Sequence, residues 1–535
     1  MLNATSVMPN YVQRFSSEGM HFRNAFVASP KCCPSRTSLL AGRFSHGLND
    51  TAQGWCGNFI TAGTWNSTWL ANVKGAGYAT GFFGKMVNEM GSMCGPRAEV
   101  PQGFDVKRGD RFVAMCNEVV YYGNTFNIDG ALVTTGSRGN ASAYLTSFLG
   151  NQTLDWLSRV APAAAAGGPP FFAYLGPHAP HFPAEPAPWY ADAPLPSDAA
   201  PRPPAFNAFR AGKSWAIREN PPFEPFTEDG IDLHFRNRQR SLMSVDDTVR
   251  DVFAALEAAG VLDNTYVIAT SDHGYHLGEF GIPFEKSTPY DTDVRVPFYV
   301  RGPGVPAGAV AEGMVSLMDV GATIMELTGA EPPGARTTDG RSLVPLLAAG
   351  GAPPAGWRNG VLIEHLGEQN QWMSICGWVF NASCTPKPRP AKDPFYLIDG
   401  PQNTYALWRV VNVRAPPGPP RPARARQPCR CFASRAPPLT PFTHTPPPRR
   451  PPTTFPTRSF VPGARRLCAR QPTGRSSTTL ARTLGRAPTS PRRPCPPLPT
   501  SCGGTRRARR AAAREKAPHG IEARRGRNRR RAASQ

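Results

Sequence analysis

A cysteine, a proline, a serine and an arginine stand close together near the start of the chain, in the order Cys32-x-Pro34-Ser35-Arg36. An apolar run follows and ends at Gly42. Proline suits the first turn of a helix, because its missing N–H would have no helical partner there. Cys32 is therefore expected just outside a helix N-terminus, where unpaired N–H groups favour a tetrahedral oxyanion. Since Arg36 adds a bidentate donor for the same anion, the pattern predicts an anion site around Cys32.

Three further groups of polar residues each follow an apolar run that is short enough for a buried strand. In chain order they are Lys85 after residues 77–84, His178 and His181 after residues 170–175, and Asp272 and His273 after residues 265–270. Open α/β sheets gather ligand groups at the carboxyl ends of their strands, so these side chains are expected around one site. Asp272 is suited to a hard divalent cation, with His273 as its neighbour. Each group alone has a plainer interpretation, as a solvated lysine, an inert loop histidine or a turn.

Together these motifs resemble those of the sulfatase family. Residues 32–42 match the pattern C-x-P-S-R-x-x-x-L-x-G, and residues 77–85 match G-Y-x-T-x-x-x-G-K. The S-D-H-G-Y-H segment at 271–276 is close to the endosulfatase form, and Asn88 stands where that branch carries asparagine. The resemblance covers roughly residues 8–410. It points to the branch of N-acetylglucosamine-6-sulfatases, extracellular endosulfatases and algal-type arylsulfatases.

The resemblance implies hydrolysis of a sulfate monoester, of the aryl sulfate or glucosamine-6-sulfate type, on a small molecule or a glycan. A formylglycine-generating enzyme would oxidise Cys32, and one hydroxyl of the hydrated aldehyde would attack sulfur. One Ca²⁺ is implied, with Asp272, His273 and the modified Cys32 as ligands. The residues implied to bind the sulfate and neutralise its charge are Arg36, Lys85, His181 and Lys286. By the H-x-P spacing, His181 is the expected sulfate contact and His178 the weaker candidate.

The elements that must position these residues predict an α/β protein. The resemblance implies the alkaline-phosphatase-like sulfatase fold, a mainly parallel sheet with helices on both faces. Strands are expected at 77–85, 170–175, 265–270 and 296–300, and helices at 70–74, 143–157, 238–260 and 316–329, with a covering loop at 184–226. Asp246 and Asp247 could be taken for catalytic carboxylates. Because they lie on the amphipathic helix 238–260, they are interpreted as structural.

The charge of the chain divides it into two parts. Residues 1–413 carry a net charge of −5, whereas residues 414–535 carry +27 and are rich in Arg, Pro and Ala. The second part has no periodic apolar pattern and is expected to be disordered. It is interpreted as translated intron or shifted-frame sequence, with a polybasic arm for polyanions as the alternative. We therefore expect a catalytic domain at 1–413 with an incomplete C-terminal subdomain, and no specific nucleic-acid partner.

Five N-x-[ST] sequons, at Asn3, Asn66, Asn140, Asn151 and Asn381, together with seven cysteines before residue 414, favour the secretory pathway. An extracellular, cell-wall or lysosomal protein is expected, although no signal peptide opens the chain and no apolar run is long enough to span a membrane.

One feature of the family pattern is absent. The resemblance implies an apolar strand ending in two aspartates before Cys32, which residues 1–31 do not contain, so the chain is expected to lack its N-terminal strand and to fold poorly. Three alternatives remain: a phosphate or phosphonate ester hydrolase, an inactive sulfatase-like remnant, and a polyanion-binding protein that uses the basic tail.

Overall fold

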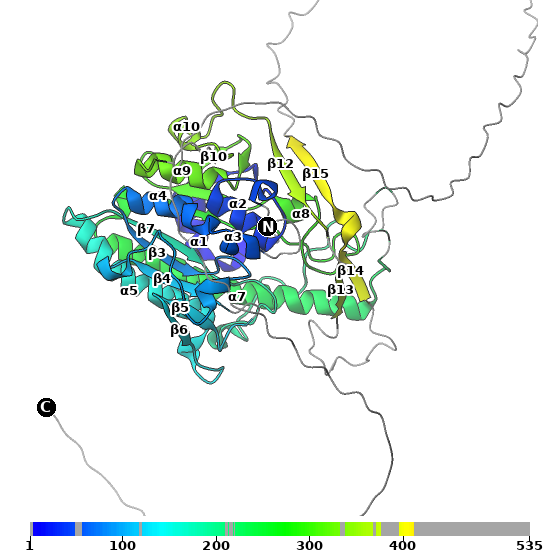
Figure 1. Cartoon of the computed structure of the whole chain (residues 1–535). Coiled ribbons are helices and arrows are strands. Elements are labelled where there is room, and N and C mark those ends of the chain that lie inside the picture. The colour runs from blue at the N-terminus through cyan, green and yellow to red at the C-terminus, as the bar shows by residue number, and fades with distance from the viewer. Residues whose placement is uncertain are drawn as a thin grey trace, which may run out of the picture. The chain divides into compact units, whose positions relative to one another are not determined.

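The computed structural model of the protein describes residues 4–48, 56–116, 120–208, 212, 218, 220–331, 338–367, 371–375 and 395–410. The expected boundary at 413/414, the basic tail and the sequons at Asn3 and Asn381 lie outside the described residues. Strands and helices alternate along the described part, which confirms the expected α/β class (Figure 1).

The larger sheet of the described part has the strand order β6-β5-β4-β3-β7. Its strands are β3 (Ala79–Gly84), β4 (Arg111–Met115), β5 (Thr125–Ile128), β6 (Ala131–Thr134) and β7 (Phe171–Gly176). The central strand β3 pairs in parallel with both β4 and β7. The antiparallel strands β5 and β6 extend the sheet on the side of β4.

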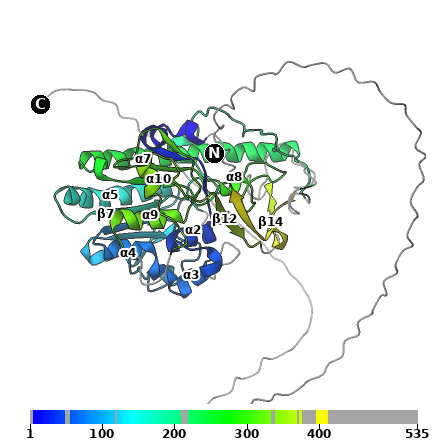
Figure 2. The same ribbon diagram turned by 90° about the horizontal axis from the view of Figure 1, so that it is seen from above.

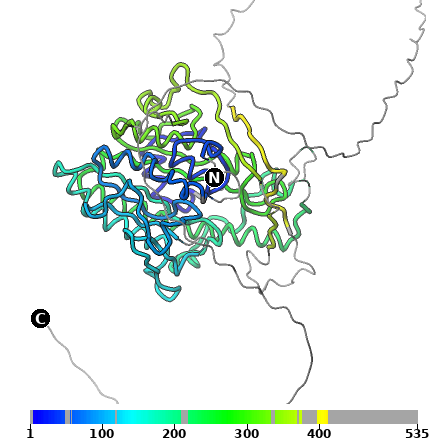
Figure 3. The backbone as a smooth tube through the Cα atoms, viewed as in Figure 1, coloured from blue at the N-terminus to red at the C-terminus, as the bar shows by residue number. Residues whose placement is uncertain are grey.

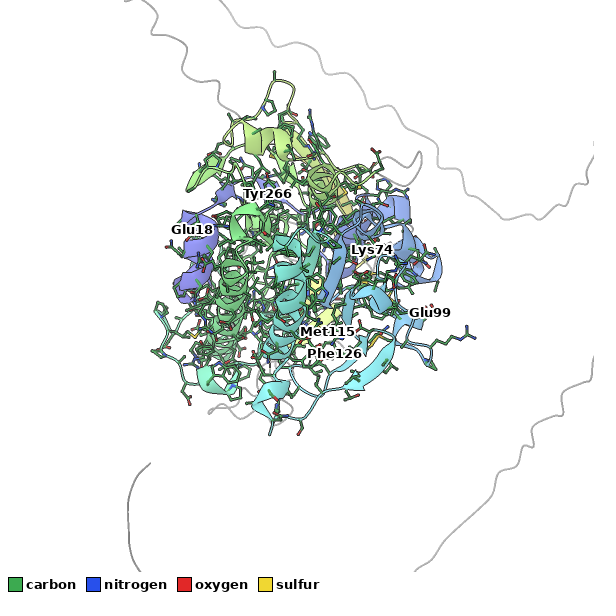
Figure 4. All side chains as sticks on the ribbon, turned by 90° about the vertical axis from the view of Figure 1, so that its left-hand side faces the viewer. Glu18, Lys74, Glu99, Met115, Phe126 and Tyr266 are labelled. Atoms are coloured by element: carbon green, nitrogen blue, oxygen red, sulfur yellow. A yellow bond between two sulfur atoms is a disulfide. The ribbon has the colours of Figure 1, made fainter. Side chains whose placement is uncertain are left out.

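Helices cover both faces of this sheet. The side chains of β3 are therefore buried on both of its faces. Phe82 packs in the cluster that contains Trp69, and the next residue, Phe83, packs against Trp156 on the other face. The first face carries α4 (Trp69–Gly75) together with α2 (Cys32–Ala41) and α9 (Asp319–Thr328). The second carries α5 (Leu145–Ala165) and α7 (Pro225–Ala258), which lie side by side in Figure 2, on the other side of the strands from α4. Met115 and Phe126, labelled in Figure 4, are opposite each other on β4 and β5 in the cluster beneath α5.

A second sheet has the order β10-β1-β9-β8. Its strands are β1 (Met20–Phe22), β8 (Val267–Thr270), β9 (Phe298–Arg301) and β10 (Ala309–Ala311), of which only β1 and β10 are parallel. The edge strands β7 and β8 are not paired with each other in the described part. A cavity of about 1610 Å³ runs along both and is also lined by residues of α7 such as Val245, Val249 and Val252.

The described residues before Cys32 form only short elements. They are η1 (Ala4–Val7), α1 (Pro9–Tyr11), η2 (Val12–Ser17), β1 and β2 (Ala25–Phe26). None of these described elements is the apolar strand with two terminal aspartates that the family pattern implies.

Strands from late in the chain lie beside the cysteine segment, as the tube in Figure 3 shows. Strand β12 (Gly360–His365) pairs with β15 (Tyr405–Val410), and β13 (Gln371–Ser374) pairs with β14 (Phe395–Asp399). The N–H of Glu364 donates to the carbonyl of Ala28, which joins β12 to the chain just before Cys32. The remaining described elements are η3 (Ser45–Leu48), α3 (Gly57–Thr61), η4 (Thr64–Ser67), η5 (Gly91–Cys94), η6 (Val106–Arg108), η7 (Ala141–Ala143), η8 (Pro188–Tyr190), η9 (Leu262–Asn264), α8 (Asp291–Val294), β11 (Val315–Ser316), α10 (Val344–Ala348) and η10 (Pro401–Asn403).

The expected strands at 77–85, 170–175, 265–270 and 296–300 are present with small shifts in their ends, but two helices are longer than expected. Helix α7 begins at Pro225 and not near residue 238. Its added turns bury Phe226, Ile231 and Phe235 against Met373 and other residues of the β13–β14 ribbon. This partner lies far away in sequence, so local periodicity could not reveal the extension. Helix α5 likewise continues through an alanine-rich stretch to Ala165.

Candidate active site

Cys32 is the first residue of α2, preceded by Lys31 in an extended conformation. The expectation that Cys32 lies just outside the helix is therefore wrong by one position. Pro34 is the third residue of the helix and is tolerated there, since the first-turn N–H groups have no intrahelical partner. The Cys32 side chain is buried and forms no disulfide. It lies in the first turn, toward which the positive end of the helix dipole points.

Arg36 lies one turn further along α2, with only 4% of its surface exposed. Its Nε donates to the carbonyl of Met86 at 2.7 Å, and its Nη1 contacts Asp272 Oδ2 at 2.5 Å. Its Nη2 donates to Asn88 Oδ1. The guanidinium therefore joins the helix that carries Cys32 to the ends of both β3 and β8, as the sequence predicts for groups at strand carboxyl ends.

Lys85 follows the last residue of β3 and is buried. Gly84 before it has φ +115°, and a Cβ there would lie 2.1 Å from the carbonyl oxygen of Gly176 on β7. Only glycine permits this close approach. The Lys85 N–H donates to the same Gly176 carbonyl at 3.0 Å, so the Gly-Lys pair of the motif directs the lysine to the end of the sheet.

His181 lies in the loop after β7 and forms a hydrogen bond with Cys32. Burial, together with the charge of Lys85, lowers the pKa of His181. Its Nδ1 donates to the carbonyl of Phe182 at 2.7 Å, which leaves Nε2 for the site. His178 is buried beside it, with ring centroids 4.5 Å apart, and packs on His181.

Lys286 is also buried, and its Nζ lies 3.0 Å from Glu285 Oε2. Burial opposes the charge of Lys286, but the negative charges of Cys32 and Glu285 outweigh burial and raise its pKa. Burial likewise acts to raise the pKa of Glu285, and the charges of Lys286 and Lys31 hold it at about 2. The pair is therefore ionised at neutral pH.

The charges around the site also shift the pKa of the Cys32 thiol. Burial acts to raise its pKa, but the charges of Lys286, His273 and Lys85 and the hydrogen bond with His181 hold that pKa well below its usual range. If Cys32 were oxidised to formylglycine, as the resemblance implies, an oxygen of the aldehyde or its hydrate would take the Sγ position. A site that stabilises a thiolate here stabilises an oxyanion at the same place.

One group of side chains in the described ranges could hold a metal ion. It consists of Cys32, Asp272 and His273, whose ligand atoms all lie within 4.8 Å of one another. His273 Nδ1 donates to the carbonyl of Gly274 at 2.7 Å, so Nε2, 3.3 Å from Cys32 Sγ, is directed toward this group. The charges of His273 and Arg36 overcome burial and lower the pKa of Asp272, which keeps a carboxylate available. One carboxylate, one imidazole and the Cys32 position form a convergent set that fits part of a cation's coordination shell.

The structure thus brings together every residue that the sequence singled out for the site: Cys32, Arg36, Lys85, His181, Asp272, His273 and Lys286. Asp246 and Asp247 lie elsewhere and are structural: Asp246 accepts from the N–H of Tyr11 at 2.7 Å, and Asp247 accepts from Tyr190 at 2.9 Å. The sequence analysis did not identify Lys31 and Glu285 as part of the site. The only sequence signal for them is that Lys31 precedes Cys32 and Glu285 precedes Lys286.

The described site and fold agree with comparisons to known proteins. The family model described as Sulfatase matches residues 3–330. The N-acetylglucosamine-6-sulfatase of Bos taurus is 34% identical over 408 residues, which cover 74% of this chain and 69% of that protein. The extracellular sulfatase SULF-1 homolog of Drosophila melanogaster is 32% identical over 376 residues, covering 69% of this chain and 32% of that protein.

A solved structure described as a complex with D-glucosamine-2-N,6-O-disulfate has a TM-score of 0.52 and 20% identity, covering 76% of this chain and 84% of that one. This likeness concerns the fold alone. The fold is the alkaline-phosphatase-like sulfatase fold that the sequence predicts. The chain belongs to the sulfatase family, and its expected kinship with N-acetylglucosamine-6-sulfatases and extracellular sulfatases is confirmed.

Proposed function

We propose that the protein hydrolyses sulfate monoesters with formylglycine, made from Cys32, as the nucleophile. The observation that supports this most directly is the convergence of buried cations on one buried, unpaired cysteine at a helix N-terminus. The hydrated aldehyde would supply one hydroxyl that attacks sulfur and displaces the alcohol, and a second whose deprotonation would restore the aldehyde and expel sulfate.

The residues of the chain act on the charge and the geometry of the sulfate group. Lys85 and Lys286 hold positive charge beside the transferring group, where negative charge grows in the transition state. Arg36 holds the Asp272 carboxylate and fixes the end of β8 relative to α2. His181, whose lowered pKa keeps it neutral and whose Nδ1 donates to the Phe182 carbonyl, is placed to accept a hydrogen bond on Nε2 from a hydroxyl of the hydrated aldehyde.

We propose Ca²⁺ as the cation, with Asp272 as its anionic ligand and His273 and the modified Cys32 beside it. A bound cation polarises the sulfuryl oxygens. Calcium titration should raise the melting temperature of the protein, because a ligand that binds only the folded state stabilises it. Asp272→Asn should abolish this increase, whereas Asp263→Asn, at an exposed site, should retain it. An equal increase in both variants would place the cation elsewhere.

The proposed substrates are aryl sulfates and glucosamine 6-sulfate groups. The curated relatives include an N-acetylglucosamine-6-sulfatase and an extracellular sulfatase homolog, and the solved structure is described as a complex with a glucosamine disulfate. Since the fold alone is shared with that structure, a sulfated glucosamine remains our proposal for this chain.

The secretory pathway is the proposed location, with a formylglycine-generating enzyme as the partner that modifies Cys32. Two disulfides, Cys33–Cys56 and Cys94–Cys116, support it, as do the exposed sequon residues Asn140 and Asn151. No helix in the described ranges combines the length and the apolar character needed to cross a bilayer.

The test is to produce the protein together with a formylglycine-generating enzyme and to measure release of 4-methylumbelliferone from its sulfate ester. Mass spectrometry of the Cys32 peptide measures conversion to formylglycine. We expect turnover that requires conversion and is lost in Cys32→Ala. Faster turnover of the phosphate ester would favour a phosphate ester hydrolase. Complete conversion without turnover of aryl or glucosamine sulfates would support the inactive remnant.

A further inference from the structure

A second cluster of buried polar residues lies directly behind the site and joins it to the last described strands. Lys31, the neighbour of Cys32, donates to Ser287 Oγ at 3.0 Å and lies 3.6 Å from Asp399 Oδ2. Ser287 is the neighbour of Lys286. The cluster therefore touches the residues adjacent in sequence to both the nucleophile and a sulfate-binding cation.

Asp399, at the end of β14, organises this cluster. Both of its carboxylate oxygens lie 3.2 Å from His365 Nε2, and Oδ1 accepts from Asn403 Nδ2 at 3.0 Å. Lys31 is 7% exposed and Asp399 is 2% exposed. A buried ion pair of this kind leaves an uncompensated charge if one partner is removed.

The backbone on both sides of Lys286 is in an unusual conformation. Glu285 has φ +115° and Ser287 has φ +109°, in a region that non-glycine residues rarely adopt. Such conformations persist only where the surroundings determine them. Ser287 is held by three side chains: Lys31 donates to its hydroxyl, and Asn403 Nδ2 and the Tyr405 hydroxyl donate to its carbonyl at 2.8 and 3.1 Å.

From these contacts we infer that Asp399 is a positioning residue, which through Lys31 and Asn403 holds the strained segment that directs Lys286 toward Cys32. The inference deepens the proposed function and rests on it. It gives the late strands β12, β14 and β15 a role in building the sulfate site. It thereby supports including them in the catalytic domain, which we propose extends to residue 413.

The test compares Asp399→Asn with Asp110→Asn. Asp110 is a matched control because it is also a buried aspartate paired with a lysine, 2.7 Å from Lys74 Nζ, beside β3 and away from this cluster. The readouts are the melting temperature, kcat and KM on 4-methylumbelliferyl sulfate, and the affinity for inorganic sulfate measured by calorimetry with Ca²⁺ present. Under the proposed function, binding of inorganic sulfate depends on Lys286 and can be measured without any turnover of an ester.

Both variants should lower the melting temperature, but only Asp399→Asn should weaken sulfate binding and lower kcat/KM, each by about tenfold or more. Tyr405→Phe, which removes one hydrogen bond to the Ser287 carbonyl and keeps the ring, should lower kcat/KM by about two- to tenfold and is the test if Asp399→Asn does not fold.

Two outcomes would overturn the inference: sulfate affinity in Asp399→Asn equal to that of the wild type, or sulfate affinity reduced equally in Asp110→Asn. If Asp399→Asn does not fold, an unchanged kcat/KM and sulfate affinity in Tyr405→Phe would overturn it. If the wild-type chain binds sulfate without turning over any ester, and Asp399→Asn loses that binding, the proposed function fails while the positioning role stands.

Discussion

Lys286 is the cation whose charge acts most strongly to lower the pKa of Cys32. Because the same charge faces the sulfate in the proposed reaction, Lys286→Met should lower kcat/KM on an aryl sulfate by roughly 10²–10³-fold, as for loss of one donor to a developing oxyanion. Lys74→Met, which breaks the Lys74–Asp110 pair, serves as the control for general loss of an ion pair. Similar activities of the two variants would remove Lys286 from the sulfate site.

Glu285 predicts a specific pH dependence of stability. Its pKa falls from 4.5 to about 2 on folding, so the ionised form stabilises the fold above pH 4.5, and this contribution is lost as the pH falls toward 2. Glu285→Gln should therefore unfold at lower urea concentration than the wild type at neutral pH, and the difference should shrink on acidification. Urea titrations from neutral pH to pH 2 measure it. A difference that grows on acidification would contradict the assignment.

At the scale of single residues, the sequence could predict the residues that belong to motifs but not the buried residues that contact them. Cys32 and Arg36 stand in a fixed spacing on one helix, and Lys85 and Asp272 end predicted strands. Asp399 lies more than three hundred residues from Lys31, and no local pattern signals that their side chains meet. Partners of this kind follow only from the fold.

At the scale of whole elements, the sequence correctly predicts that α7 is a helix but places its first residue too late. Its amphipathic half is visible in sequence, whereas its first turns are stabilised by packing against the β13–β14 ribbon. Tertiary contacts of this kind extend a helix beyond its local signal.

Asp246 on α7 fixes the short N-terminal elements to this helix. Its carboxylate accepts from the N–H of Asn10 at 3.1 Å, from Asn10 Nδ2 at 2.7 Å and from the N–H of Tyr11 at 2.7 Å. Asp246→Ala should lower the free energy of unfolding by about 1–3 kcal/mol, because it leaves three partly buried donors unsatisfied. In the folded variant KM and kcat should be unchanged. Loss of kcat with unchanged stability would restore the catalytic interpretation of this aspartate.

On the scale of the described part of the chain, the fold class followed from the order of strands and helices, but the division of most strands between two larger sheets did not. Apolar runs predict that a strand is buried, and they carry no information about which neighbour it pairs with. Strand β3 has partners on both sides, whereas the apolar strands β7 and β8 each have one partner among the described strands and border the cavity of about 1610 Å³.

This arrangement predicts different amide exchange in strands of similar composition. Alternate N–H groups of a strand point to opposite neighbours, so in β3 all of them face a partner strand, while in β7 and β8 alternate ones face the cavity. Those amides should exchange with deuterium about tenfold or more faster than the amides of β3, because their opening does not require the sheet to separate.

Residue-resolved hydrogen exchange on the intact chain measures this difference, with the amides of β7 that face β3 as an internal reference. Fast exchange confined to the alternate residues that face the cavity would support two separate sheets in solution. Protection of β7 and β8 as high as that of β3 would mean that another strand pairs between them. The two sheets would then be one continuous sheet whose carboxyl edge carries Lys85, His181 and Asp272 together.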